Sequence, residues 1–229
     1  MTRRAFFITF EGIDGCGKST QGTRLTEALE KRGLRVTHTF EPGGTMLGRK
    51  LRTILLHDDL HISPFSEVLL FAADRRQDVD EIISPALERD DVVIGERFAD
   101  SSVAYQGVAG NVGKERVERL MDIVTSSLVP DLTLLLDIEP RVSLARKTKL
   151  DNIEQRGSFL DDVRQAFLDM SDEHANRFVV IDAARSPDAG HGADVDRPAV
   201  FGRRDADEVQ PLRVGDHLGA PQRVLHVVD

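Results

Sequence analysis

The chain has 229 residues, of which 40% are hydrophobic and 30% are charged, with a formal net charge of −9 and a single cysteine. This composition is typical of a water-soluble α/β protein, and the acidic balance argues against a nucleic-acid scaffold, which normally presents a basic face. No apolar run reaches the ~20 residues that a membrane span needs, and one cysteine allows no internal disulfide, so we expect a cytoplasmic protein with neither a nucleic acid nor a membrane as partner.

Short apolar runs alternate with helical patterns along the first 185 residues, as they do in parallel βαβ units. The runs predict strands at residues 6–10, 35–40, 92–95, 132–138 and 178–182. Because the runs are continuous, the strands are expected to be covered on both faces. The predicted fold class is therefore α/β, with three layers around a parallel five-stranded sheet.

Helices are expected between these strands. The first begins near Lys18 and ends at Gly33, because glycine is favoured just past the end of a helix. Another is predicted over residues 66–77, and a third directly after it, where Pro85 is expected to break or kink the chain. Helical spacing of apolar residues returns over residues 117–128 and 163–170.

Residues 186–229 differ in composition from the rest of the chain. Nine of these 44 residues are glycine or proline, against 18 of the first 185. Their aliphatic residues are scattered, which is typical of segments that bury little apolar surface. We therefore predict one α/β domain at 1–185 and a loosely ordered or disordered tail at 186–229.

The strongest motif is the segment G-I-D-G-C-G-K-S at residues 12–19, which follows the first predicted strand and opens the first predicted helix. It matches G-x-x-x-x-G-K-[ST], the phosphate-binding loop of P-loop nucleoside triphosphatases. Lys18 is expected to reach the β- and γ-phosphates, and Ser19 to give its hydroxyl to Mg²⁺. The predicted ATP-binding residues are Gly12, Ile13, Asp14, Gly15, Cys16, Gly17, Lys18, Ser19 and Thr20.

The loop alone does not name the reaction, because P-loop proteins include GTPases, transport ATPases and kinases. The guanine-specific pattern N-K-x-D is absent from the chain. A plainer interpretation of the loop is a glycine-rich turn that binds no nucleotide. For Cys16 the alternatives are a position that needs a small side chain and a redox-regulated thiol.

Further motifs resemble the thymidylate kinase family of P-loop nucleoside monophosphate kinases, in the family's order over residues 6 to about 183. They are F-E-G-I-D-G at 10–15, E-P-G-G-T at 41–45, L-F-A-A-D-R at 70–75, E-R-F at 96–98, S-S-V-A-Y-Q-G at 101–107 and P-D-L-T-L-L-L-D at 130–137. The resemblance implies the P-loop fold and direct in-line transfer of a phosphoryl group from ATP to dTMP, in the synthesis of dTTP. It also implies Mg²⁺ as cofactor and a homodimer.

The resemblance implies an acceptor site for dTMP. Phe71 is expected to stack on the thymine ring, with Arg75 and Ser101 at the edge of the base. Arg52 and Arg97 are expected to bind the monophosphate, and Arg97 also to lie near the transferred group. The predicted dTMP-binding residues are Glu41, Arg52, Phe71, Arg75, Arg97, Ser101, Tyr105 and Gln106.

The resemblance also implies catalytic and metal-binding residues. Glu11 and Asp14 are expected near Mg²⁺ and the sugar, and Tyr105 against the sugar, where it disfavours ribonucleotides. The phosphate-binding loop has no arginine of its own, so a basic lid at about 144–157 must supply a cation over the ATP phosphates. The predicted catalytic residues are Lys18, Arg97, Glu96, Glu11, Arg146 and Lys149, and the predicted metal-binding residues are Ser19 and, through water, Glu96.

One departure from the family's pattern affects the metal site: Glu96 stands where the family usually has Asp. Plainer roles are open for two acceptor residues, since Phe71 could belong to the core and Arg75 could pair with a carboxylate. Two other functions are also open. They are a P-loop kinase for another nucleotide or a deoxynucleoside, and a nucleotide-binding homologue with weakened catalysis.

Overall fold

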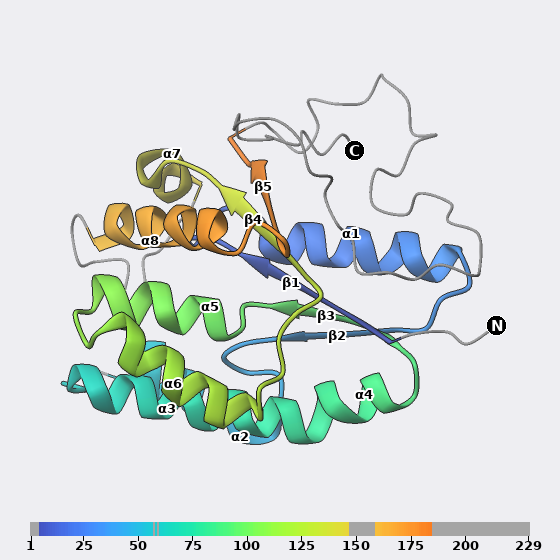
Figure 1. Ribbon diagram of the computed structural model, residues 1–229, viewed down its shortest axis with the longest axis horizontal. Coiled ribbons are helices and arrows are strands. Elements are labelled where there is room, and N and C mark those ends of the chain that lie inside the picture. Colours follow the sequence, from blue (N-terminus) through green and yellow to red (C-terminus); the bar gives the residue numbers. More distant parts are fainter. Residues whose placement is uncertain (1–4, 57, 59, 147–158, 185–229) are drawn as a thin grey trace.

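The computed structural model of the chain describes residues 5–56, 58, 60–146 and 159–184 (Figure 1). Five parallel strands form one sheet, and they are β1 (Phe6–Glu11), β2 (Val36–Phe40), β3 (Val92–Glu96), β4 (Leu132–Asp137) and β5 (Phe178–Asp182). Their order is β2-β3-β1-β4-β5, so β1 lies at the centre. The predicted α/β fold with a parallel five-stranded sheet is confirmed.

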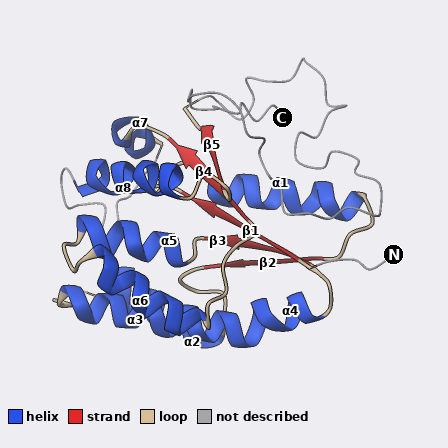
Figure 2. Ribbon diagram, in the orientation of Figure 1, coloured by secondary structure: helices blue, strands red, loops and turns tan. Residues whose placement is uncertain are grey.

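Helices join the strands and cover both faces of the sheet (Figure 2). They are α1 (Lys18–Lys31), α2 (Met46–Leu56), α3 (Pro64–Asp78), α4 (Ser84–Glu88), α5 (Ala99–Ser102), α6 (Lys114–Thr125), α7 (Pro140–Ala145) and α8 (Phe159–Glu173), with π-helical turns η1 (Val79–Ile83) and η2 (Val103–Ala109). Figure 1 shows α1 on one side of the sheet and α2 to α6 on the other. None of the described helices is both long and apolar enough to cross a membrane.

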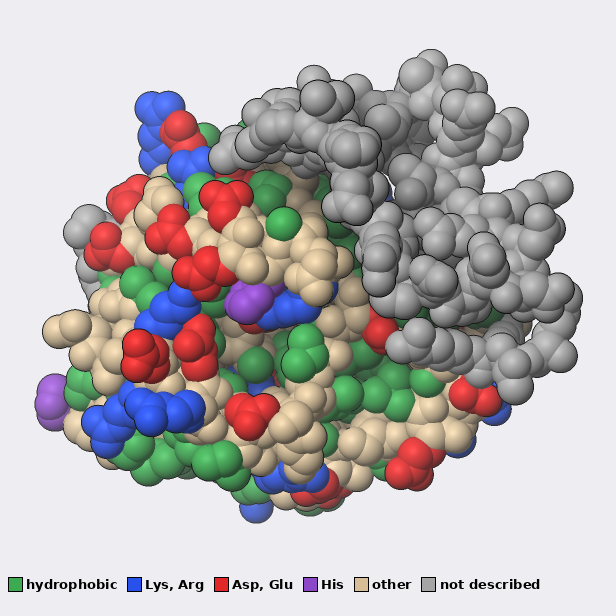
Figure 3. Space-filling view, in the orientation of Figure 1, with side chains coloured by type: hydrophobic (Ala, Val, Ile, Leu, Met, Phe, Trp, Pro, Cys, Tyr) green, Lys and Arg blue, Asp and Glu red, His purple; other side chains and the backbone are tan. Residues whose placement is uncertain are grey.

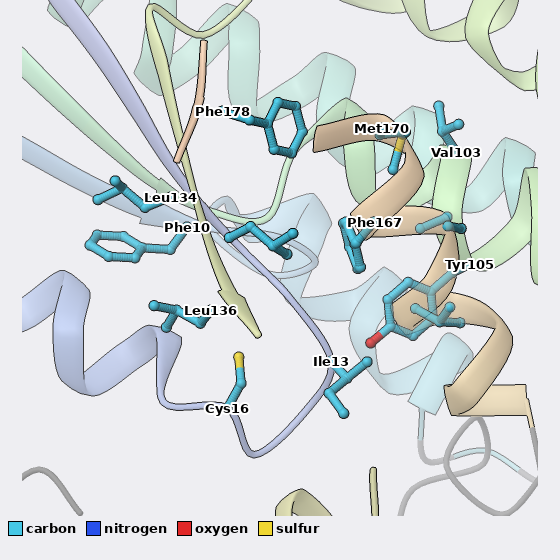
Figure 4. Packing of buried hydrophobic residues seen from close by; sticks show 14 of the residues in the cluster. Phe10, Ile13, Cys16, Val103, Tyr105, Leu134, Leu136, Phe167, Met170 and Phe178 are labelled. Atoms are coloured by element: carbon cyan, nitrogen blue, oxygen red, sulfur yellow. The ribbon is translucent and has the colours of Figure 1, made fainter. Parts of the chain in front are cut away.

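The core follows the alternation of side chains along β1 and β4. Phe10 and Leu134 point toward the α1 side of these strands in Figure 4, whereas Tyr105 of η2 and Phe167 of α8 lie on the other side. The rings of Tyr105 and Phe167 are 6.2 Å apart, edge to face. Packing on both faces fixes β1, and therefore the loop that follows it, against its neighbours.

The surface carries charges of both signs. Figure 3 shows acidic and basic side chains spread over one face, with the acidic ones gathered over α8. Exposed acidic side chains of α8 are Asp161, Asp162, Asp169, Asp172 and Glu173. The negative net charge of the chain is thus visible on this helix.

Two sequence predictions are corrected by the fold. β2 is not an apolar strand covered on both faces: it is an edge strand, and Val36, Thr37 and His38 are only half-buried. Pro85 does not interrupt the helical chain, because the wider turn η1 closes a hydrogen bond from Ser84 N–H to the Val79 carbonyl directly before it. Helix α2 was not predicted, and the tail at 186–229 and most of the lid lie outside the described residues.

Candidate active site

The phosphate-binding loop connects β1 to the amino end of α1. Gly12 and Gly15 have φ of 132° and 77°, a region that residues with a Cβ rarely adopt. Space is short as well, because a Cβ on Gly12 would lie 2.6 Å from the Leu136 carbonyl oxygen and one on Gly15 2.8 Å from the Ser143 carbonyl oxygen. A tight glycine loop at the positive end of a helix is an anion-binding arrangement.

Lys18 lies across this loop. Its Nζ donates to the carbonyl oxygens of Gly12, at 3.0 Å, and Ile13, at 2.9 Å. The Asp14 carboxylate lies 4.0 Å from the same nitrogen, and the Lys18 side chain is buried. The ammonium group is therefore held at the centre of the loop by groups that a phosphate oxygen can replace.

Ser19 and Glu96 meet at the mouth of the loop. The Ser19 hydroxyl donates to Glu96 Oε2 at 2.5 Å, and His38 Nε2 lies 3.1 Å from Glu96 Oε1. Burial raises the pKa of Glu96, but the contacts with His38 and Ser19 and the charge of Lys18 outweigh it and hold that pKa below its usual value. Glu96 is thus an ionised carboxylate beside a hydroxyl, and both are oxygen ligands suited to Mg²⁺.

Arg97 follows β3 directly and joins two sides of the site. One of its NH groups donates to Asp14 Oδ1 at 2.6 Å and to the Tyr105 hydroxyl at 3.1 Å. The other donates to the Gly12 carbonyl at 3.2 Å and to Ser101 Oγ at 3.0 Å. The φ of Arg97 is 71°, and a non-glycine residue keeps such a costly conformation, ~1–3 kcal/mol, only where its surroundings fix it.

Glu11 ends β1 beneath this arginine. Its Oε1 accepts from the Phe98 N–H at 2.7 Å and its Oε2 from the Ser101 hydroxyl at 2.6 Å. Burial, followed by the nearby Asp100 charge, raises the pKa of Glu11 to about 7. Because its two oxygens bind the turn after β3, Glu11 fixes the position of Arg97 and Ser101 in this structure.

Arg75 is fully buried and paired with Glu41. Arg75 Nε and NH2 donate to Glu41 Oε2 at 2.8 and 2.6 Å, and NH1 donates to the Ser102 hydroxyl at 2.7 Å. Ser101, the other residue expected at the edge of the base, donates to Glu11 and accepts from Arg97. The structure does place Arg75 in an ion pair, but inside the protein rather than on a solvated helix face.

The remaining acceptor residues surround this pair. Arg52 on α2 donates at 2.7 Å to the carbonyl oxygen of Pro42, the residue that follows Glu41. Phe71 on α3 is half-buried and packs against the main core, with part of its ring still accessible. Gln106 on η2 donates to Glu67 of α3 at 3.0 Å. Five of the predicted dTMP residues thus come from α2, α3 and η2, and α3 contacts both of the other elements.

The predicted lid is only partly described. Arg146 is exposed, and its NH2 donates to the carbonyl oxygens of Ala183 and Ala184 at 3.1 and 3.0 Å, beyond the end of β5. Lys149 lies outside the described residues. Of the loop residues, Thr20 is exposed on the first turn of α1, and Cys16 is buried with its sulfur 3.6 Å from Lys18 Nζ.

Comparison with known proteins identifies the family of this chain. Residues 10–192 match the family model described as thymidylate kinase. The chain belongs to the thymidylate kinase family. It is 46% identical over 185 residues to a thymidylate kinase of Thermosipho africanus, and the matched region covers 80% of this chain and 92% of that protein. It is 48% identical over 189 residues to one of Bifidobacterium longum, with the same shares covered.

A solved structure of the family shows the same fold. The crystal structure of thymidylate kinase from Ehrlichia chaffeensis superposes with a TM-score of 0.68 at 34% identity, covering 79% of this chain and 94% of the other. The resemblance seen in the sequence motifs and the expected P-loop fold are therefore confirmed.

Three residues of the site were not predicted from the sequence. His38 reaches Glu96 from the neighbouring strand, Ser102 binds Arg75, and the Ser143 hydroxyl donates to the Asp14 carbonyl in the phosphate-binding loop. Ser102 follows the predicted residue Ser101 in the same motif, so the motif could have suggested it. His38 and Ser143 lie in no motif, and only the register of the strands and the packing of α7 bring them to the site.

Proposed function

We propose that this member of the thymidylate kinase family transfers the γ-phosphoryl group of ATP to dTMP, giving ADP and dTDP for the synthesis of dTTP. The observation that carries the proposal is the position of Arg97. Its guanidinium contacts the phosphate-binding loop through Asp14 and the η2 side through Tyr105. Transfer between two phosphates needs a cation between them, because both carry negative charge.

On the donor side, residues 12–20 bind the triphosphate of ATP. Lys18 exchanges its bonds to the Gly12 and Ile13 carbonyls for oxygens of the β- and γ-phosphates. The amino end of α1 adds its partial positive charge. The same lysine then stabilises the charge that develops on the transferred group, which is a catalytic role as well as a binding one.

The donor set at the loop fits Mg²⁺. Ser19 offers a hydroxyl that would bind the ion, and Glu96 an ionised carboxylate that would hold a metal-bound water. Among the described residues no cluster of three His, Cys, Asp or Glu side chains could hold a metal alone. When bound with ATP, Mg²⁺ supplies positive charge that offsets the charge developing on the phosphoryl group.

On the acceptor side, Phe71 stacks on the thymine, and Arg75 with Ser101 or Ser102 binds the edge of the base. Glu41 holds Arg75 in place through the buried ion pair. The monophosphate is bound by Arg52 and Arg97, and Tyr105 and Gln106 line the sugar pocket. The Tyr105 ring is packed between Phe159 and Phe167, which supports a fixed wall against a 2′-hydroxyl.

The transfer is direct and in line. An oxygen of the dTMP phosphate attacks the γ-phosphorus while the bond to the ADP oxygen breaks, so no covalent enzyme intermediate forms. Glu11 contributes by binding the turn after β3, whose Phe98 N–H donates to it. Asp14 accepts a hydrogen bond from Arg97 and so connects the phosphate-binding loop to this arginine. The lid cations Arg146 and Lys149 close over the phosphates and exclude water, for which Arg146 must leave the Ala183 and Ala184 carbonyls.

The proposal extends to the form of the protein. We infer a cytoplasmic homodimer, and a chain whose single cysteine, Cys16, is buried and can form no internal disulfide fits a reducing compartment. Exposed apolar side chains on three neighbouring helices support association: Met46 on α2 is 71% exposed, Leu69 on α3 47% and Ile123 on α6 74%. Residues 186–229 are proposed to be a tail that the chemistry does not use. Sedimentation equilibrium tests the dimer.

The test of function is product formation. The protein is mixed with Mg²⁺, ATP and dTMP, and ADP release is followed while dTDP is identified by chromatography. Equal amounts of ADP and dTDP are expected, with Lys18→Ala as the inactive control. ADP without dTDP would show a hydrolase, and nucleotide binding without either product would show a homologue that no longer catalyses transfer.

A further inference from the structure

His38 lies outside every recognised motif, yet it reaches the metal-binding end of the site. In the sheet His38 of β2 is paired with Ile94 of β3. Side chains two residues apart on a strand share a face, so His38 and Glu96 both point toward the same side of the sheet. His38 Nε2 lies 3.1 Å from Glu96 Oε1, while the other oxygen of Glu96 accepts from Ser19.

Gly22 of α1 leaves the room for this contact. A Cβ on Gly22 would lie 2.8 Å from His38 Nε2, 3.0 Å from His38 Cε1 and 3.6 Å from Glu96 Oε1. Gly22 is a helix-interior residue whose backbone is not in the left-handed region, so its conformational freedom is not what the position needs. A glycine there lowers helix stability relative to alanine, and the three atoms nearest to its missing Cβ belong to His38 and Glu96.

We infer that His38 is a positioning residue of the metal site: it fixes one oxygen of Glu96 so that the other stays at Ser19. The inference rests on the proposed Mg²⁺–ATP site. Glu96 has three rotatable bonds, and fixing such a side chain costs rotamer entropy. With His38 Nε2 3.1 Å from Oε1, the carboxylate would already be placed for a metal-bound water. The contact is close but not aligned as a hydrogen bond, because Nε2 has no hydrogen-bond partner among the described residues.

Glutamine is the conservative replacement, because its side-chain amide can put a donor near the place of Nε2. Phenylalanine keeps a ring but has no donor. Gly22→Ala leaves His38 in the sequence and displaces its ring, while alanine favours the helix. Together these variants separate the polar contact at Nε2 from the packing of the ring. His61→Phe, at an exposed histidine, is the matched control.

The experiment measures Mn²⁺ binding to the protein with ADP by electron paramagnetic resonance, alongside ADP binding in the absence of metal. We expect His38→Phe and Gly22→Ala to weaken Mn²⁺ binding by ~10–100-fold, the usual effect of removing an outer-shell partner. His38→Gln is expected to stay within about threefold of the wild type, and His61→Phe to match it. Metal-free ADP binding should change in none of them.

Glu96→Gln distinguishes failure of the inference from failure of its premise. If Glu96→Gln weakens Mn²⁺ binding but Gly22→Ala and His38→Phe do not, Glu96 serves the metal and His38 does not position it. If Glu96→Gln binds Mn²⁺ like the wild type, the proposed metal role of Glu96 is wrong, and the role of His38 is wrong with it. Loss in His38→Gln as large as in His38→Phe would also overturn the inference, since the donor would then not matter.

Discussion

The buried carboxyl group of Asp78 allows a quantitative test of how burial affects ionisable groups near the proposed acceptor site. It lies at the end of α3, 1% exposed, and its Oδ1 accepts from the Thr39 hydroxyl at 2.7 Å. Its Oδ2 is buried without a hydrogen-bond partner among the described residues. Burial is the main cause that raises the pKa of Asp78 from 3.8 to about 7, and the neighbouring Asp74 charge adds to it. The carboxyl group is therefore protonated in the folded protein at mildly acidic pH.

The sign of the pH dependence follows from this raised pKa. Below pH 3.8 the group is protonated in both states, and its contribution to stability is fully present. As pH rises toward 7, the unfolded chain loses the proton and the folded chain keeps it, so stability falls until both are ionised. A shift of about three pKa units corresponds to ~4 kcal/mol in all, of which roughly 2–3 kcal/mol is lost between pH 5 and pH 8.

Asp78→Asn removes this titration and can keep the bond from Thr39, since the amide oxygen still accepts. The free energy of unfolding is measured by urea titration at pH 5 and at pH 8 for both proteins. We expect it to fall between these pH values in the wild type by roughly 2–3 kcal/mol more than in the variant. Asp122→Asn, on the exposed side of α6, is the control and should follow the wild type. An Asp78→Asn variant with the pH dependence of the wild type would refute the reasoning.

Three further predictions concern the site and the tail. Lys18→Ala should lower kcat by ~10²–10³-fold, measured by coupled ADP release, because it removes a cation from the transition state; unchanged kcat would leave Lys18 with a structural role. Arg97→Ala should lower kcat and raise KM for dTMP together, and Arg97→Lys should restore little, because lysine lacks the planar fork; wild-type kinetics for Arg97→Ala would remove it from the acceptor site. A chain that ends at Arg185 should keep dTMP kinase activity, since all proposed site residues precede it. Failure to bind ATP would make residues 186–229 part of the working structure.

The sequence predicted the features that local patterns determine. Residues 178–182 form a strand with the expected bounds, and the loop at 12–19 lies between a strand and a helix as its motif requires. β2 was predicted as a strand, but its expected cover on both faces was wrong, because it lies at the edge of the sheet with Val36, Thr37 and His38 half-buried. Pro85 was expected to break or kink the chain, but the chain stays helical there: the π-helical turn η1 is followed directly by α4, which contains Pro85.

The sequence did not predict which side chains of different helices and strands contact each other. The ion pair of Glu41 with Arg75 spans 34 residues, and the contact of His38 with Glu96 depends on the register of β2 against β3. The resemblance implied that Arg75 and Ser101 both bind the edge of the base, and in the structure the turn of α5 directs Ser101 to Glu11 and Ser102 to Arg75. Which of two adjacent serines faces a given side chain is decided by helical geometry, not by the motif.

The most direct test of the central claim is a comparison of phosphate acceptors. kcat/KM is measured by coupled ADP release for dTMP, dUMP, dCMP, AMP and the ribose form of TMP, with Mg²⁺ and ATP held constant. We predict that dTMP is best, that dUMP is weaker by ~10–200-fold, as loss of a methyl group from an apolar pocket costs ~1–3 kcal/mol, and that the ribonucleotides are poor. A clear preference for AMP, or for a nucleoside without a phosphate, would contradict the assignment.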